Sequence, residues 1–216
     1  TVTALNDNDP FILYDEKKDD DGNKEDNILN IGVAENAAAV TDIEARDADL
    51  PAETLTFSIS GGADAALLKI APDTGILTFI NPRDFESPAD AGADNVYDIT
   101  VQVTDGSRTF SQDVVVKITP INDNTPTITS DGGGGTAALS IAENGAAVTV
   151  VKAKDADLPA ETLTFSISGG ADAAVFTLAP ATGVLTFIVA PDFETPQDAD
   201  LNNTYEVIVQ VSDGNG

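Results

Sequence analysis

The stretch DADLPAETLTFSISGGADAA lies at residues 47–66 and occurs again, without a single change, at residues 155–174. The similarity continues beyond it at the same offset of 108 residues, because NVYDITVQVTDG at 95–106 matches NTYEVIVQVSDG at 203–214. A period of this length corresponds to a whole domain and is longer than the repeats of solenoid proteins. The sequence therefore predicts two tandem copies of one domain.

Apolar and polar residues alternate in several segments of each copy. In the first copy the apolar members are Leu55, Phe57, Ile59, Tyr97, Ile99, Val101, Val103, Val114, Val116 and Ile118. Such segments, separated by turn sequences such as Pro72-Asp73-Thr74-Gly75 and Asp105-Gly106, are typical of strands with one buried face. About seven strands per copy and no long helical pattern predict an all-β fold of tandem seven-stranded Greek-key β-sandwiches, immunoglobulin-like in architecture.

The composition excludes several classes of function. The chain carries 37 acidic and 10 basic residues, a formal net charge of −27, which disfavours nucleic acids and anionic membranes and favours divalent cations. It contains no Cys and no His, which excludes disulfides, a Ser-His-Asp triad and the commonest zinc ligand. No apolar run approaches the roughly 20 residues that cross a bilayer, so membrane insertion is not expected.

The repeat also predicts where the domains begin and end. The expected parts are a tail strand and linker of a preceding domain (1–27), a first domain (28–121), a linker (122–138) and a second domain without its final strand (139–216). Because the expected first and last parts are incomplete domains, the sequence suggests a fragment of a longer array. The charged insert DEKKDDDGNKED at 15–26 is expected to be a solvated, mobile loop.

Short acidic motifs recur at the ends of the predicted strands. In the first copy they are Glu35, Asp47, Asp49, Asp84, Glu86, Asp105 and the run Asn122-Asp123-Asn124. Their counterparts are Glu143, Asp155, Asp157, Asp192, Glu194, Asp213 and the upstream run Asn6-Asp7-Asn8. Each motif alone suits an ordinary turn, but all of them offer oxygen atoms, and Ca²⁺ takes about six to eight oxygen ligands. Alternate residues of an extended segment share one side, so both carboxylates of DAD or DFE can face one ion.

The order xEx, DxD, DxE, xDx and NDNxP resembles the calcium-binding signature of cadherin repeats, and it covers nearly the whole chain. The surrounding LTFSISGGAD, TGxLTF and PDFE sequences most resemble bacterial cadherin-like domains of secreted and surface adhesins, including the Rap-type agglutinins of rhizobia. The resemblance implies a cadherin-like sandwich, bound Ca²⁺ and an extracellular or bacterial cell-surface location. Pro120 departs from the family linker, which usually has Asp there.

The resemblance also implies a set of ligands for each ion. The joint between the copies would hold one ion on Glu35, Asp84, Glu86 and Asp123. A second ion would use Glu35, Glu86, Asp123, Asp157 and the carbonyl of Ile121. A third would use Asn122, Asp155, Asp157, Asp213 and the carbonyl of Asn124. An upstream joint would use Asn6, Asp7, Asp47, Asp49 and Asp105, and Glu143, Asp192 and Glu194 would form a half-site for a following linker.

Three classes of function remain open on the sequence. The favoured one is a calcium-rigidified adhesion or extender module, whose partners are neighbouring repeats of the same or another chain. A calcium-dependent lectin that binds acidic exopolysaccharide is an alternative, and so is a filament subunit that donates its leading TVTAL strand to another chain. A glycosidase using Asp84 and Glu86 is disfavoured, because the same pair recurs in both copies beside other calcium-type acids, so no enzyme is expected.

Overall fold

The computed structural model describes residues 5–13, 28–49 and 54–215. The chain divides into two compact units, Thr1–Ile121 and Asn122–Gly216. The charged insert at 15–26 and the first four residues of the expected tail strand lie outside the described residues. None of the helices in the described part of the chain is long and apolar enough to span a membrane.

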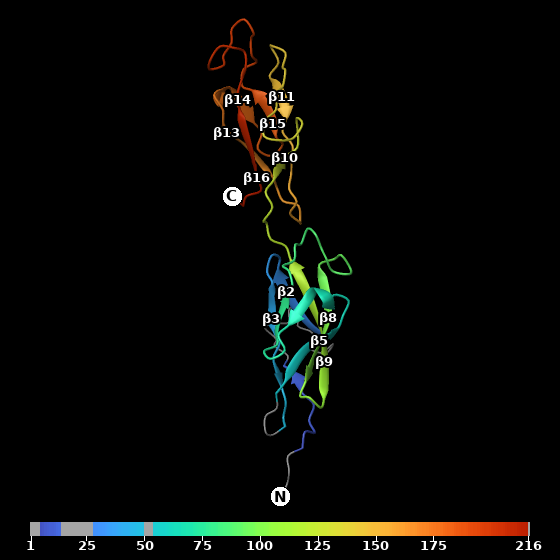
Figure 1. The fold of residues 1–216 in the computed structure, drawn as a ribbon. Helices are drawn as coiled ribbons and strands as arrows, with labels where there is room; N and C mark the ends of the chain where they lie inside the picture. Colours follow the sequence, from blue (N-terminus) through green and yellow to red (C-terminus); the bar gives the residue numbers. More distant parts are fainter. Residues whose placement is uncertain (1–4, 14–27, 50–53, 216) are drawn as a thin grey trace. The chain divides into compact units, whose positions relative to one another are not determined.

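The first unit is a β-sandwich (Figure 1). Its strands are β1 (Phe11–Ile12), β2 (Ile28–Ala34), β3 (Ala39–Asp42), β4 (Ala45–Arg46), β5 (Thr56–Gly61), β6 (Leu68–Ile70), β7 (Ile76–Phe79), β8 (Val96–Thr104) and β9 (Thr109–Thr119). One sheet has the order β2-β9-β8-β5, the other has the order β3-β7-β6, and β1 pairs with β4. The pairing of β2 with β9 is parallel and the other pairings in the unit are antiparallel. The all-β prediction is confirmed.

Burial follows the alternation that the sequence predicts. Along β8, Tyr97, Ile99, Val101 and Val103 are at most 2% exposed, whereas the intervening side chains face outward or are half-buried. Strand β9 continues the pattern with Val114, Val116 and Ile118, and together the two sheets enclose one apolar core. The edge-to-face contact of Phe79 with Tyr97, at 5.0 Å between ring centroids, joins the two sheets. A two-residue period with one apolar face therefore accounts for the first sandwich.

A tight turn before β7 requires glycine. Gly75 has φ +72°, and a Cβ atom there would lie 2.1 Å from the carbonyl oxygen of Ile43. The turn brings Gly75 beside the end of β3, the neighbouring strand of the same sheet, where its carbonyl accepts the N–H of Ile43 at 2.9 Å. The second unit repeats this arrangement at Gly183, whose φ is +69°. The conformation explains why both copies carry Thr-Gly at this place.

The second unit repeats most of this plan. Its strands are β10 (Thr127–Ile128), β11 (Ala147–Val150), β12 (Ala153–Lys154), β13 (Thr164–Gly169), β14 (Phe176–Leu178), β15 (Val184–Phe187) and β16 (Ile208–Ser212). They form sheets with the orders β11-β15-β14, β13-β16 and β10-β12. Its core contains Val151, Phe165, Phe176, Leu185 and Phe187, with stacking of Phe176 on Phe187.

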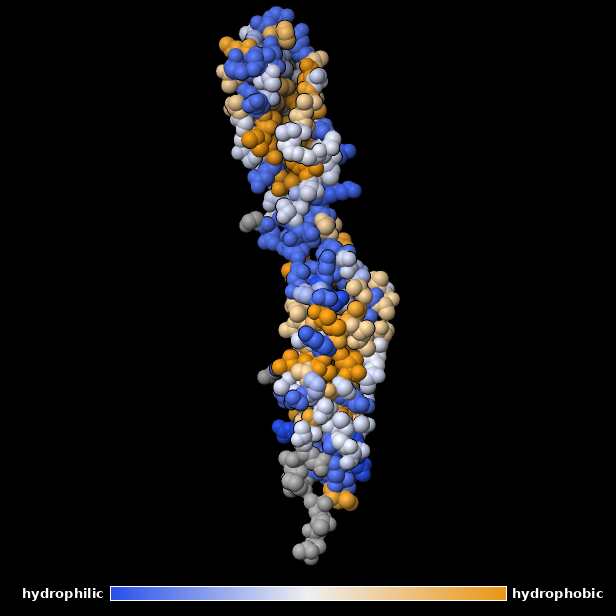
Figure 2. Space-filling model, viewed as in Figure 1, coloured by the Kyte–Doolittle hydropathy of each residue, from blue (hydrophilic) through white to orange (hydrophobic). Residues whose placement is uncertain are grey.

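The two units differ where β2 lies in the first unit. Residues 136–142, which match β2 at the offset of 108 residues, form no strand. Val209 and Val211 of β16 are half-buried, whereas Val101 and Val103 at the equivalent places are fully buried. On the face drawn in Figure 2, apolar residues reach the surface in the middle of each unit and hydrophilic residues gather toward its ends.

Candidate metal centres

Three aspartates of the first unit converge where strands end. Asp47 and Asp49 follow β4, Asp105 follows β8, and one carboxylate oxygen of each lies within 4.8 Å of the others. The DAD segment orders itself, because the N–H of Asp49 donates to Asp47 Oδ1 at 2.8 Å. Asp105 Oδ1 accepts the N–H groups of Ser107 and Arg108, both at 2.6 Å. The structure therefore brings these three candidate ligand side chains together.

The upstream run reaches this cluster. Asn8 donates to Asp49 twice, through its backbone N–H at 3.0 Å and through its side-chain amide at 2.5 Å. Asp49 is 6% exposed. Two oxygens of the cluster, Asp47 Oδ2 and Asp105 Oδ2, are buried and accept no hydrogen bond. Buried carboxylate oxygens without a donor are costly unless a cation satisfies them, so the donor set fits a divalent ion.

The second unit builds the same cluster from its own residues. Asp155, Asp157 and Asp213 also bring one oxygen each within 4.8 Å of one another. Asn124 donates to Asp157 through its side chain at 2.8 Å and its backbone N–H at 3.2 Å. Asp155 Oδ2 is again buried without a hydrogen-bond donor. The site is thus reproduced by an independent stretch of sequence.

Glutamates form a second type of cluster. Glu35, which directly follows β2, is 3% exposed and accepts the N–H of Phe85 at 2.8 Å and that of Ile121 at 2.7 Å. An oxygen of Glu35 lies within 4.8 Å of one of Glu86. The N–H of Glu86 donates to Asp84 Oδ1 at 3.0 Å. Asp84 itself is exposed.

The equivalent glutamate cluster of the second unit is open. Glu143, Asp192 and Glu194 each bring an oxygen within 4.8 Å of the others, and all three are exposed. Glu143 accepts the N–H of Phe193 at 3.0 Å, and the N–H of Glu194 donates to Asp192 at 3.1 Å. Two hydrogen bonds of the AEN and DFE sequences, from Phe85 or Phe193 to the glutamate and within the DFE segment, therefore recur in both copies.

Residues of the Asn-Asp-Asn run lie at the start of the second unit. The N–H of Asp123 points to Asp157 at 3.4 Å, and the side-chain amide of Asn122 donates to Glu161. The Asn215 side chain donates to the carbonyl oxygen of Asn122 at 2.7 Å. Asn6, at the matching place before the first unit, is half-buried and Asp7 is exposed. Both units share one feature of the Asn-Asp-Asn run: its last asparagine, Asn8 or Asn124, donates hydrogen bonds to the DxD motif.

Hydrogen bonds favour the ionised form of Asp49, Asp105 and Asp157. The amide of Asn124 lowers the pKa of Asp157 below its ordinary value of 3.8, and the amide of Asn8 does the same for Asp49. The backbone N–H of Arg108 is the main cause of the lowered pKa of Asp105. Three carboxylates held within 4.8 Å repel one another when all are ionised, and a divalent cation removes this repulsion.

The lowered pKa of Asp157 has a testable consequence in the calcium-free chain. A carboxyl whose pKa is lower in the folded state contributes stability above its unfolded pKa, and this contribution is lost as the pH falls through the folded pKa. An NMR titration of the Asp157 side-chain carbon should therefore give a midpoint below 3.8. The Asn124→Ala variant should move this midpoint upward. A wild-type midpoint above 3.8 would contradict the hydrogen-bond assignment.

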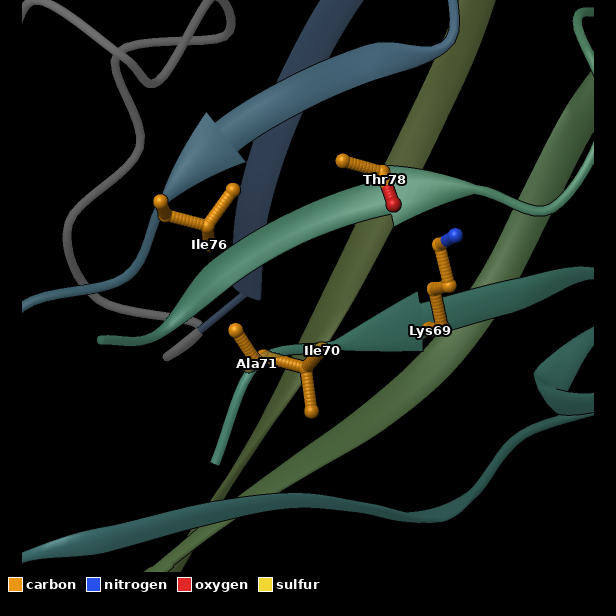
Figure 3. A pocket seen from close by; sticks show the side chains of 5 residues that line it. All are labelled: Lys69, Ile70, Ala71, Ile76 and Thr78. Carbon is orange, nitrogen blue, oxygen red and sulfur yellow. The ribbon is translucent and has the colours of Figure 1, made fainter. Parts of the chain in front are cut away.

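A shallow hollow lies beside β6 and β7, away from these motifs in sequence. It is lined by Lys69, Ile70, Ala71, Ile76 and Thr78, whose side chains Figure 3 shows along the two strands. These residues include no carboxylate and no aromatic ring. The hollow therefore offers neither a cation site nor the stacking platform typical of a carbohydrate site.

Further acidic residues hold the DFE loop and were not among the predicted ligands. Asp64 and Asp90 are buried and accept backbone N–H groups, as do Asp172 and Asp198 in the second unit. Their recurrence at the offset of 108 residues was the available indication in the sequence. This recurrence was not sufficient to predict their role, because the sequence does not show that an aspartate in a polar loop is buried.

Comparison with known proteins finds relatives among the cadherins and protocadherins. No family model matches the chain. Human protocadherin Fat 1 is 32% identical over 220 residues, covering 99% of this chain, and human protocadherin Fat 4 is 32% identical over 166 residues, covering 75%. The chain spans only 4% and 3% of the lengths of these two relatives. Human cadherin-23 is 26% identical over 82% of the chain, which spans 5% of that protein.

Solved structures match over nearly the whole chain. The protocadherin gammaB7 EC3-6 cis-dimer structure gives a TM-score of 0.64 at 22% identity, covering 98% of this chain and 49% of that one. Human protocadherin-24 EC1-2 gives 0.63 at 19% identity, covering 96% of this chain and 94% of that one. At these identities the likeness shows the fold. Together with the motif order and the sequence relatives, it identifies the two repeats of this chain as cadherin-like domains.

Proposed function

We propose that this chain is a calcium-binding adhesion module of an extracellular protein, with Ca²⁺ bound where consecutive repeats join. The observation that carries the proposal is the pair of aspartate clusters, Asp47/Asp49/Asp105 and Asp155/Asp157/Asp213. Both are built alike by separate stretches of sequence, and both contain buried carboxylate oxygens that accept no hydrogen bond. An arrangement that is costly without a cation and is built twice is best explained by cation binding.

Each cluster supplies only part of a calcium coordination sphere. Three carboxylates leave several of the roughly six to eight positions to other oxygens. The run preceding each domain is the natural source, because Asn8 and Asn124 already bind the DxD motif. We infer that Asn122, Asp155, Asp157, Asp213 and the Asn124 carbonyl hold one ion at the joint between the copies, with Asn6, Asp7, Asp47, Asp49 and Asp105 serving the upstream joint.

The glutamate clusters would complete the joints from the other side. In this proposal Glu35, Asp84, Glu86, Asp123, Asp157 and the Ile121 carbonyl share two further ions, and Glu143, Asp192 and Glu194 await a following repeat. Calcium would neutralise the acidic joint, and its binding energy would appear as stability and stiffness. A stiff chain of sandwiches presents an adhesive domain at a distance from the surface that carries it.

The proposal places this module outside the cell, on a bacterial surface or in its matrix. The extracellular placement draws on the cadherins and protocadherins among its relatives, and the bacterial placement draws on the LTFSISGGAD and PDFE sequences. The partners would be neighbouring repeats of the same or another chain. No catalytic role is proposed for Asp84 and Glu86. The N–H of Glu86 donates to the carboxylate of Asp84, two residues earlier, just as the N–H of Asp49 donates to Asp47 in the DxD motif.

Calcium titration of the full chain tests this function. We expect calorimetry to show uptake of several ions, and Mg²⁺ at the same concentration to bind more weakly, because crowded carboxylates suit the larger ion. At a free calcium concentration about 100 times the dissociation constant, each ion adds about 2.7 kcal/mol to stability, so the melting temperature should rise by about 10 °C or more. A chain that takes up no calcium and melts at the same temperature in chelator would refute the proposal.

A further inference from the structure

Each unit contains a chain of hydrogen bonds that begins at two buried carboxylates and ends at the glutamate cluster. In the first unit Asp64, 3% exposed, accepts the N–H of Ala91 at 2.8 Å and that of Asp98 at 2.9 Å. Asp90, 7% exposed, accepts the N–H groups of Asp94 and Asn95, both at 3.0 Å. These four bonds pin the loop between the DFE segment and β8.

The pinned loop holds the DFE segment itself. The side-chain amide of Asn95 donates to the carbonyl oxygen of Phe85 at 2.8 Å, and the N–H of Phe85 donates to Glu35 at 2.8 Å. Asn95 has φ +64°, in the left-handed region where asparagine is favoured, so its backbone shape depends on the loop that Asp90 fixes. Phe85 is thereby held from both sides, next to Glu86.

The second unit repeats every link. Asp172 accepts the N–H groups of Ala199 and Glu206, both at 2.7 Å. Asp198, 2% exposed, accepts those of Asn202 at 2.7 Å and Asn203 at 3.2 Å. Asn203 then donates to the carbonyl of Phe193 at 3.1 Å, and the N–H of Phe193 donates to Glu143 at 3.0 Å. The residues of the glutamate cluster in this unit are exposed. The hydrogen bonds of the loop therefore form without burial of the cluster.

The inner carboxylates are placed as acceptors for the backbone. Both oxygens of Asp64 and both of Asp90 accept a backbone N–H. Burial acts to raise the pKa of Asp90, but hydrogen bonds from the N–H groups of Asp94 and Asn95 lower it below the ordinary value, so the acceptor is ionised. Groups that orient metal ligands without touching the metal commonly change its affinity by about tenfold or more when they are removed.

We propose that Asp64, Asp90 and Asn95, with Asp172, Asp198 and Asn203 in the second copy, are positioning residues that set the calcium affinity of the glutamate clusters. They act through Phe85 and Phe193, which place Glu86 and Glu194 beside Glu35 and Glu143. This inference rests on the proposed calcium-binding function and adds to it a group of residues outside the ligand motifs.

The test compares two variants of the same loop in the full chain. Asp90→Asn removes one acceptor and turns an amide donor toward the backbone N–H groups. Asp94→Asn removes the same charge but keeps the acceptor, because the second copy already has Asn202 there, binding Thr204 as Asp94 binds Val96. Calcium is titrated by NMR with the amide of Glu86 as reporter, and the amide of Ser107, bound to Asp105, as internal reference.

We expect Asp90→Asn to weaken the affinity seen at Glu86 about tenfold while the affinity at Ser107 stays at its wild-type value. Asp94→Asn should leave both close to wild type. Equal affinities at Glu86 in the two variants would overturn the positioning role and leave calcium binding intact. A wild-type chain in which calcium moves neither reporter would instead overturn the proposed function.

A second variant keeps the test decisive if Asp90→Asn does not fold. Asn95→Asp keeps the shape of the side chain and adds a negative charge, but it loses the donor to the Phe85 carbonyl. Charge alone would strengthen calcium binding, whereas loss of positioning should weaken it at Glu86. Stronger binding in Asn95→Asp would overturn the proposal.

Discussion

The Glu35→Ala variant of the calcium-free chain should destabilise the first unit by about 2–4 kcal/mol. Glu35 is buried and accepts the N–H groups of Phe85 and Ile121, so its removal leaves two backbone donors without an acceptor. Each such loss costs about 1–3 kcal/mol, and a loss of 1 kcal/mol shifts the melting temperature of a domain of this size by about 4–8 °C. Scanning calorimetry in chelator should therefore show one unit melting about 8 °C earlier or more.

The chain contains the matched control for this variant. Glu143 occupies the same place in the second copy but is exposed and accepts a single N–H, that of Phe193. Glu143→Ala should cost about 1 kcal/mol or less, since water can replace an exposed acceptor. Equal losses for the two variants would show that burial of Glu35 does not contribute, and the structural account of this residue would be wrong.

The Asp157→Ala variant should have the largest effect on calcium binding. In the proposed arrangement Asp157 contributes to two ions at the joint, so calorimetry should show a lower number of bound ions than in the wild-type chain. Both sandwiches should remain folded, because Asp157 lies outside the apolar core of the second unit, but the loss of this buried acceptor should lower the stability of that unit. An unchanged number of ions would remove Asp157 from the ligand set.

Asp49 provides a control with the same local structure. It is the second aspartate of a DAD motif, as Asp157 is, and it accepts the same type of hydrogen bonds, from Asn8. Asp49→Ala removes an equal charge but belongs to the upstream cluster of the first unit. The two variants should therefore affect different ions, and the NMR reporter at Ser107 should respond to Asp49→Ala and not to Asp157→Ala. Identical responses would mean that charge, rather than ligation, determines calcium uptake.

The alternation of side chains was enough to predict the sandwich, because strand faces are set by a two-residue period. Tyr97, Ile99, Val101 and Val103 are buried as that period requires. The convergence of Asp47, Asp49 and Asp105 could also be predicted, since motifs at strand ends of a sandwich meet at the same edge. The positions of the aspartate clusters could thus be predicted from the sequence once the sandwich fold had been predicted.

Burial of individual acidic residues could not be predicted in the same way. Glu35 and Glu143 lie in the same AEN sequence, yet Glu35 is 3% exposed and Glu143 is exposed. In the first unit Ile121, which follows β9, supplies one of the two backbone donors to Glu35. The roles of Asp64 and Asp90 were likewise hidden, since they bind backbone N–H groups that carry no sequence identity.

The most direct test of the central claim measures how calcium changes the distribution of distances between the two repeats. The chain has no cysteine, so Ser58→Cys and Ser166→Cys, equivalent exposed sites of the two copies, would carry spin labels at two defined positions. Pulsed electron paramagnetic resonance should give a broad distribution in chelator and a narrow one in calcium, and Asp157→Ala should keep it broad in calcium. A wild-type distribution of the same width with and without calcium would contradict the proposal that calcium joins the repeats.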